Sequence, residues 1–151
     1  MSNFDLSEQL KKLRPKKVTR AAAALPQTAQ AALFTVTGRV NIKKIIGVVT
    51  TVIQTQANDT KLVANPTVGA DVDLCAVLDV SADAVGTNYT ITGTLANAMV
   101  ATTSGANVTQ AAPVTVQAGT IDLNCAASNT GAVSWLIEYE EIDEGATVVA
   151  A

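Results

Sequence analysis

From residue 33 onward, short runs rich in Val, Thr and Ile alternate with turn-forming Gly, Asn, Asp and Ser. Several short strands at such spacing predict an all-β fold with a single β-sandwich or barrel-like domain. The run 40–56 is long enough that we expect a kink at Gly47. The expected strands are 33–37, 40–56, 61–64, 72–79, 88–95, 98–103, 113–117, 120–126, 132–140 and 146–150.

The clearest of these strands covers residues 132–140. Val133, Trp135, Ile137 and Tyr139 occupy alternate positions and therefore share one face. The positions between them are polar, except that Leu136 interrupts the pattern. This alternation predicts a strand with one face in the core and the other toward solvent.

The first 32 residues have a different pattern. Leu6, Leu10 and Leu13 recur at i, i+4 and i+7, which places them on one face of a short helix over about residues 3–14. A helix of about a dozen residues is marginally stable alone in water, so we expect this one to dock on a partner.

Local signals mark the ends of this helix. Ser2 and Asp5 have the spacing of a capping box, and Pro15 cannot continue a helix. The residues after Pro15 are rich in Lys, Ala and Gln and predict an extended linker. The chain therefore divides into a basic N-terminal arm, 1–32, and a β-rich globular domain, 33–151.

Composition limits the chemistry. Of 151 residues, 26 are Ala, 20 Thr and 19 Val, and none is His. Without His the chain lacks the commonest general base and metal ligand, so we expect a protein that is not an enzyme and holds no cofactor or metal. A Ser–Lys dyad on Lys43, Lys44 or Lys61 stays open as an alternative, although no motif marks one.

Two smaller groups of residues have alternative interpretations. Cys75 and Cys125 fit two buried thiols better than one disulfide. Asp71 and Asp73 have the alternate spacing of Ca²⁺ ligands, but the loop lacks the glycine and distal glutamate of an EF-hand. Solvated positions explain these carboxylates more simply.

Charge is distributed unevenly along the sequence. Residues 1–44 hold nine of the ten basic residues and a net charge of +7, whereas 45–151 carries −10. Such asymmetry predicts a basic arm that binds an acidic surface. The basic run lacks aromatic residues for base stacking, which favours a protein partner over nucleic acid. The expected docking residues are Leu6, Leu10, Leu13, Lys11, Lys12, Arg14, Lys16, Lys17 and Arg20.

An acidic patch near the C-terminal end complements the arm. Its members fall within seven residues, and they are Glu138, Glu140, Glu141, Asp143 and Glu144. They fit either a solvated strand end or an acceptor for the basic arm of a neighbouring subunit. Both interpretations stay open.

Five segments of the β-rich part resemble small virion proteins of tailed bacteriophages, namely Phe34–Gly38, Ile45–Thr51, Asp73–Ala76, Tyr89–Gly93 and Gly131–Trp135. The resemblance covers about residues 33–150 and does not include the arm. It implies a capsid decoration (cement) protein, with a small β-rich body, often trimeric, that clamps neighbouring capsomers on the capsid exterior.

The resemblance further implies that the major capsid protein and other copies of the chain are the partners. We expect synthesis in the host cytoplasm, a place on the virion surface, and no membrane span or signal peptide. The alternatives are a tail or head-fibre component and a carbohydrate-binding or adhesin module.

Overall fold

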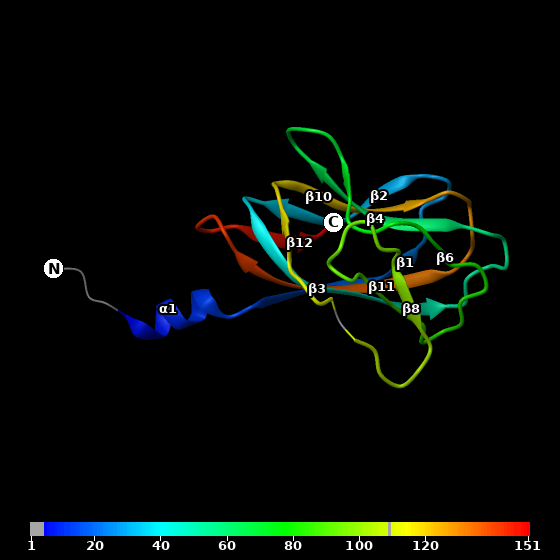
Figure 1. Cartoon of the computed structure of the whole chain (residues 1–151), viewed down its shortest axis with the longest axis horizontal. Coiled ribbons are helices and arrows are strands. Elements are labelled where there is room, and N and C mark those ends of the chain that lie inside the picture. Colours follow the sequence, from blue (N-terminus) through cyan, green and yellow to red (C-terminus); the bar gives the residue numbers. More distant parts are fainter. Residues whose placement is uncertain (1–4, 109) are drawn as a thin grey trace.

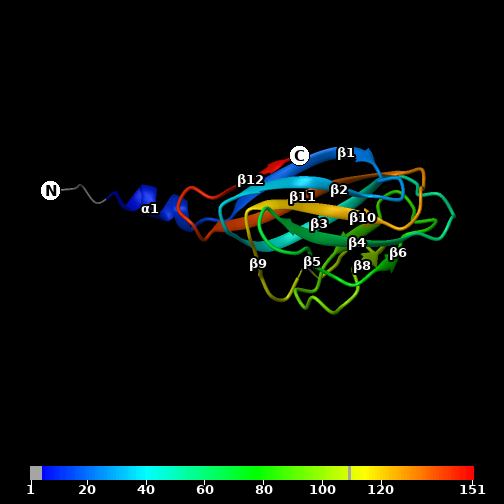
Figure 2. The same cartoon turned by 90° about the horizontal axis from the view of Figure 1, so that it is seen from above.

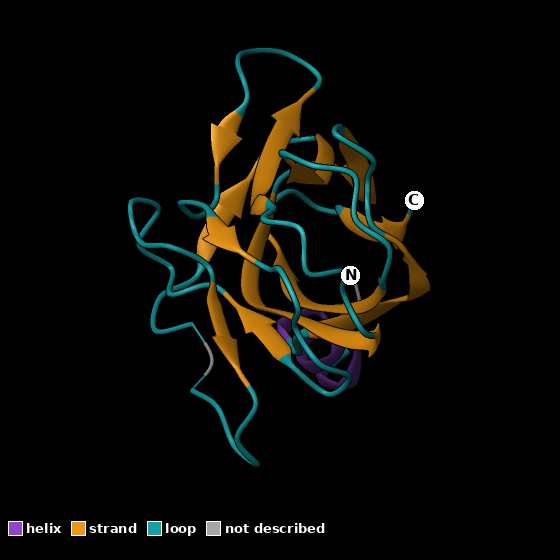
Figure 3. Cartoon of the chain, turned by 90° about the vertical axis from the view of Figure 1, so that its right-hand side faces the viewer, coloured by secondary structure: helices purple, strands orange, loops and turns teal. Residues whose placement is uncertain are grey.

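Two antiparallel β-sheets packed face to face form the body of the protein, seen from the side in Figures 1 and 2 and end-on in Figure 3. The computed structural model describes residues 5–108 and 110–151. Within these residues no strand pairs from one sheet to the other, so the fold is a sandwich and not a closed barrel. The all-β prediction is confirmed. One helix, α1 (Leu6–Leu13), projects from one end of the body.

The first sheet, sheet A, contains both long strands of the fold. In spatial order its strands are β1 (Lys16–Ala24), β11 (Ala132–Glu141), β3 (Val40–Thr51), β7 (Asn88–Thr90) and β8 (Val100–Thr102), with β9 (Val114–Val116) also paired to β3. The burial along β11 alternates as its sequence predicts, because Val133, Trp135, Ile137 and Tyr139 all face the core.

The second sheet, sheet B, covers the other side of the core. Its order is β12 (Thr147–Ala150), β2 (Gln30–Thr37), β10 (Gly119–Cys125), β4 (Asp59–Pro66) and β5 (Val72–Asp73), with β6 (Leu78–Asp79) also paired to β4. The expected strand 72–79 is thus two short strands. Leu74 and Cys75, which lie between them, are buried in the core.

The expected linker after Pro15 is instead a strand of the body. β1 pairs with β11 from Lys16 opposite Tyr139 to Ala24 opposite Ala132. Its sequence is rich in Ala, which has a low strand propensity, so the pattern alone did not reveal it. The sandwich therefore begins at Lys16, and the expected linker belongs to it as β1, the connection 25–29 and the start of β2.

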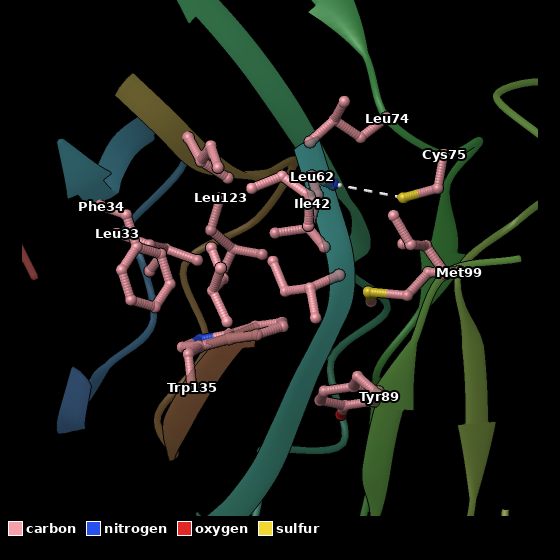
Figure 4. Close-up of a cluster of buried hydrophobic side chains, with 14 of the residues drawn as sticks. Leu33, Phe34, Ile42, Leu62, Leu74, Cys75, Tyr89, Met99, Leu123 and Trp135 are labelled. Carbon is pink, nitrogen blue, oxygen red and sulfur yellow. Dashed lines mark hydrogen bonds between the residues drawn. The ribbon is translucent and has the colours of Figure 1, made fainter. Parts of the chain in front are cut away.

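The core centres on Trp135, whose ring stacks on Tyr89 with centroids 6.3 Å apart (Figure 4). β3 passes Gly47 without a break in its pairing with β11, so the expected kink is not found there. Gly47 lies opposite Trp135, and a Cβ at this position would sit 2.7 Å from the indole Cζ3 atom. Glycine is therefore required because the large ring covers the backbone.

Candidate functional site

Helix α1 begins at an aspartate cap. The Asp5 carboxylate accepts hydrogen bonds from the Ser7 backbone N–H, at 2.9 Å, and from the Ser7 hydroxyl, at 2.8 Å. Together with the Glu8 N–H, these bonds hold the pKa of Asp5 below its ordinary value. Ser2, the other residue of the expected capping box, lies outside the described residues.

The apolar face of α1 points into solvent. Leu6, Leu10 and Leu13 keep 59%, 48% and 73% of their surface exposed, although they share one face of the helix as expected. Figure 1 shows why: the helix extends away from the end of the sandwich instead of packing on either sheet. Exposed leucines on one helix face are typical of a docking surface.

The basic residues assigned to the arm divide between α1 and the body. Lys11 pairs with Glu8 on the helix at 2.7 Å, and Arg14 caps the helix end through its backbone N–H. The side chain of Lys12 lies outside the described part of the structure. The remaining three lie in β1 and belong to sheet A; of these, Lys17 is exposed, whereas Lys16 and Arg20 are half-buried.

The acidic patch contacts basic residues of its own chain. Asp143 accepts a 2.7 Å hydrogen bond from the Arg39 guanidinium and a 2.9 Å bond from the Arg39 backbone N–H. The guanidinium, together with this N–H, holds the pKa of Asp143 below its ordinary value. Further ion pairs join Lys16 to Glu141, Lys43 to Glu140 and Lys44 to Glu138.

Folding therefore brings the two charge blocks of the sequence together. β1 and β3 carry basic residues and both pair with β11, which carries the acidic ones. Three of the ion pairs, from Lys16, Lys43 and Lys44, thus join neighbouring strands of sheet A. The binding of a neighbour's arm to this patch stays a prediction, and the patch has partners in its own chain.

The two aspartates with the spacing of Ca²⁺ ligands contact other side chains of the fold. Asp73 pairs with Lys61 at 2.7 Å, and Asp71 accepts a 2.9 Å hydrogen bond from Gln30. Within the described residues, no group of three or more His, Cys, Asp or Glu side chains is arranged to hold a metal ion.

Both cysteines are buried and unpaired. The Cys75 sulfur accepts a hydrogen bond from the Leu62 N–H at 3.4 Å (Figure 4), and that of Cys125 accepts one from the Thr60 hydroxyl at 3.6 Å. Burial raises the pKa of both thiols, which disfavours the reactive thiolate. The expectation of two core thiols agrees with this geometry.

The outer face of sheet A carries an apolar surface that the sequence interpretation missed. Leu136, Ile46 and Val48 line a shallow hollow of about 570 Å³ on this face. A second hollow, of about 540 Å³, lies over β7 and β8, where Val100 and Val108 contribute to the lining. The break that Leu136 makes in the alternation of β11 is the signal that could have revealed this surface.

No protein-family model matches the chain, and neither a curated protein nor a solved structure does. No helix in the described part of the chain is long and apolar enough to cross a membrane. The geometry itself must therefore indicate the function. It provides a projecting amphipathic helix with exposed leucines and an apolar hollow on sheet A, and both are suited to binding other proteins.

Proposed function

We propose that the protein is a non-enzymatic structural component of a bacteriophage head, a capsid decoration protein that docks through its N-terminal arm. One observation carries the proposal: α1 holds three leucines in solvent at the end of a rigid sandwich. The resemblance of the β-rich segments to small phage virion proteins supports the location. The major capsid protein and further copies of the chain are the proposed partners.

The strength of such a contact can be bounded. Full burial of a leucine side chain contributes about 1.5–3 kcal/mol, so the three of α1 supply up to roughly 5–9 kcal/mol before the entropic cost of association. A single arm therefore binds with micromolar affinity at best. Stable attachment requires several arms acting together, which is what an oligomeric body on a repeating capsid surface provides.

The connection between the N-terminal helix and the sandwich can transmit force. α1 leads through Arg14 and Pro15 directly into β1, and β1 is held to β11 along most of its length. A pull on the docked helix is thus distributed over many backbone hydrogen bonds of sheet A. A flexible linker would not transmit the force in this way.

The buried aromatic residues argue against a carbohydrate-binding role. Sugar-binding modules stack exposed aromatic rings on their ligands. The aromatic residues in the described part of the chain are all buried, and they are Phe34, Tyr89, Trp135 and Tyr139. The alternative is a head-fibre or tail component. Binding of the protein to isolated tails would favour that alternative.

Truncation tests the docking role. The cut belongs after Arg14, because removal of residues up to 20 would also delete half of β1 and its pairs with β11. We expect deletion of residues 2–14 to abolish binding to capsids that lack the protein. It should also remove the protection of those capsids against heat disruption.

The melting temperature of the isolated sandwich serves as the control. It should change little on truncation, because the leucines of α1 lie outside the core. Undiminished capsid binding by the truncated chain would contradict arm docking, and binding to tails but not to heads would contradict the decoration role.

A further inference from the structure

Arg20 faces the interior of the sandwich from an edge strand. It lies directly opposite Trp135 in the pairing of β1 with β11, and residues opposite each other in an antiparallel pair share one face of the sheet. Trp135 is buried in the core, so the Arg20 side chain also lies on the face of sheet A that is turned toward sheet B. Arginine is rarely found on such a face, because its guanidinium always carries a charge.

The guanidinium of Arg20 has no protein partner in the part of the chain that the structure describes. Its Nε atom is buried, and no hydrogen-bond acceptor of residues 5–108 or 110–151 reaches it. Arg20 forms no ion pair with these residues either, whereas Lys16 on the same strand pairs with Glu141. A buried donor without an acceptor destabilises a fold, so its presence points to an acceptor that binds from outside the chain.

A cavity of about 80 Å³ lies beside Arg20, between the two sheets. Its walls come from β1, β2, β10, β11 and the connection that follows β1. Among the described residues, every lining side chain other than Arg20 is apolar. Leu33, Leu123 and Trp135, which belong to these walls, gather in the same part of the core (Figure 4).

Irregular pairing on both sides accompanies the cavity. β1 has a bulge between Arg20 and Ala23, and the pairing of β2 with β10 shifts at Leu33. Bulges of this kind occur where a strand re-aims its side chains. Ala24 and Ala31 line the cavity and are exposed, so it opens to solvent between β1 and β2.

The walls specify the chemistry of a ligand. A guanidinium binds a carboxylate through two parallel hydrogen bonds, and one carboxylate balances its single charge. A phosphate dianion would keep one charge unbalanced, because no second cationic side chain of the described residues lines the cavity. The apolar walls suit an aliphatic stem. A water-sized group needs roughly 10–15 Å³ of such space, so the cavity has room for a carboxylate on two or three carbons.

We propose that this cavity binds a carboxylate on a short aliphatic stem, held by the guanidinium of Arg20. The carboxylate belongs either to a free short-chain acid, such as propionate, or to a glutamate side chain of another protein, which ends in the same propionate group. The site is separate from the docking helix α1, and truncation after Arg14 leaves all of its residues in place.

Titration of the full chain with sodium propionate tests the inference. The fluorescence of Trp135 reports binding, because this ring lines the cavity and is the only tryptophan of the chain. We expect a saturable change in emission that sodium chloride at equal ionic strength does not produce. Propionamide has the same shape without the charge, and it should bind at least about tenfold more weakly.

A second probe distinguishes the two sources of the carboxylate. N-acetyl-glutamate amide presents the glutamate side chain without free backbone charges. If it binds as propionate does, a protein side chain can occupy the site. If propionate alone binds, the site takes free acids.

Two variants test the assigned contacts. Arg20→Met keeps a linear stem and removes the charge, and it should weaken propionate binding at least about tenfold, whereas Lys17→Gln, at an exposed cation of the same strand, should leave it unchanged. Ala31→Leu keeps the guanidinium but narrows the opening, and it should weaken binding as well. Melting curves check that each variant is folded.

An inward charge on an edge strand can also serve only to prevent pairing with other chains. Arg20→Met would then self-associate in sedimentation, and propionate would leave the emission of the wild-type protein unchanged. That result would overturn the inference. Equal binding of propionate and propionamide, or equal affinity of propionate for the wild type and Arg20→Met, would overturn it too.

Discussion

Replacement of Gly47 by alanine tests the packing at the centre of the sandwich. The new Cβ would lie 2.7 Å from Cζ3 and 2.8 Å from Cη2 of Trp135, where ordinary contacts begin near 3.4 Å. The ring must therefore shift by about 0.7 Å in a closely packed core, and overpacking of this kind costs about 1–3 kcal/mol. For a chain of 151 residues this corresponds to a decrease of roughly 2–12 °C in melting temperature.

The assay is thermal and urea unfolding followed by far-ultraviolet circular dichroism, with two comparisons. Gly105→Ala is the matched control, because no heavy atom lies within 4 Å of a Cβ at that exposed position, and we expect it to be nearly neutral. In a Trp135→Phe background, Gly47→Ala should cost less, since the smaller ring leaves space. If it destabilises both backgrounds equally, the collision with the indole ring is not the reason for glycine, and the argument is refuted.

Three further predictions concern other contacts. Tyr89→Phe removes a 2.6 Å hydrogen bond from the hydroxyl to Asp83 and should cost about 1–3 kcal/mol in urea unfolding. Asp143 has a lowered pKa, so its pair with Arg39 stabilises the fold above the unfolded-state value of 3.8, and this contribution is lost as the pH falls through the lower folded-state pKa. Asp143→Asn should therefore reduce the acid sensitivity measured in a pH series of melting curves. Both cysteine thiols should react with a thiol reagent only after denaturant is added, and rapid labelling of the native protein would contradict their burial.

The strands that could be predicted are those with a strong pattern of their own. β11 carries large apolar residues at alternate positions and β3 is rich in Val and Ile, and the structure has both strands. β1 could not be predicted, because its alanines carry little preference and its pairing with β11 stabilises it. The predicted kink at Gly47 was wrong for a similar reason. Glycine is required there by the ring of Trp135, which lies far away in the sequence.

The candidate site likewise has a part that local sequence predicts and a part that it does not. The leucine face of α1 follows from local spacing, and the structure places the three side chains together and exposed. The acidic patch was expected to be either solvated or bound by the arm of a neighbouring subunit, and its pairs with Lys16 and Arg39 of the same chain were not predicted because these residues lie in distant parts of the sequence. The apolar surface on sheet A combines Leu136 of β11 with Ile46 and Val48 of β3, so the interrupted alternation at Leu136 was its only sign within one strand.

The position of β1 also has a consequence for synthesis. Its partner, β11, follows it by about 110 residues, which a ribosome adds in roughly 5–20 seconds. During that interval the nascent chain carries an unpaired alanine-rich strand behind a helix with exposed leucines. Sheet A can close only after the residues of β11, up to Glu141, have been synthesised, so its completion is expected to be late. Neighbouring ribosomes on one messenger would hold several such unpaired strands close together, and copies of the chain could therefore meet before any of them has finished folding.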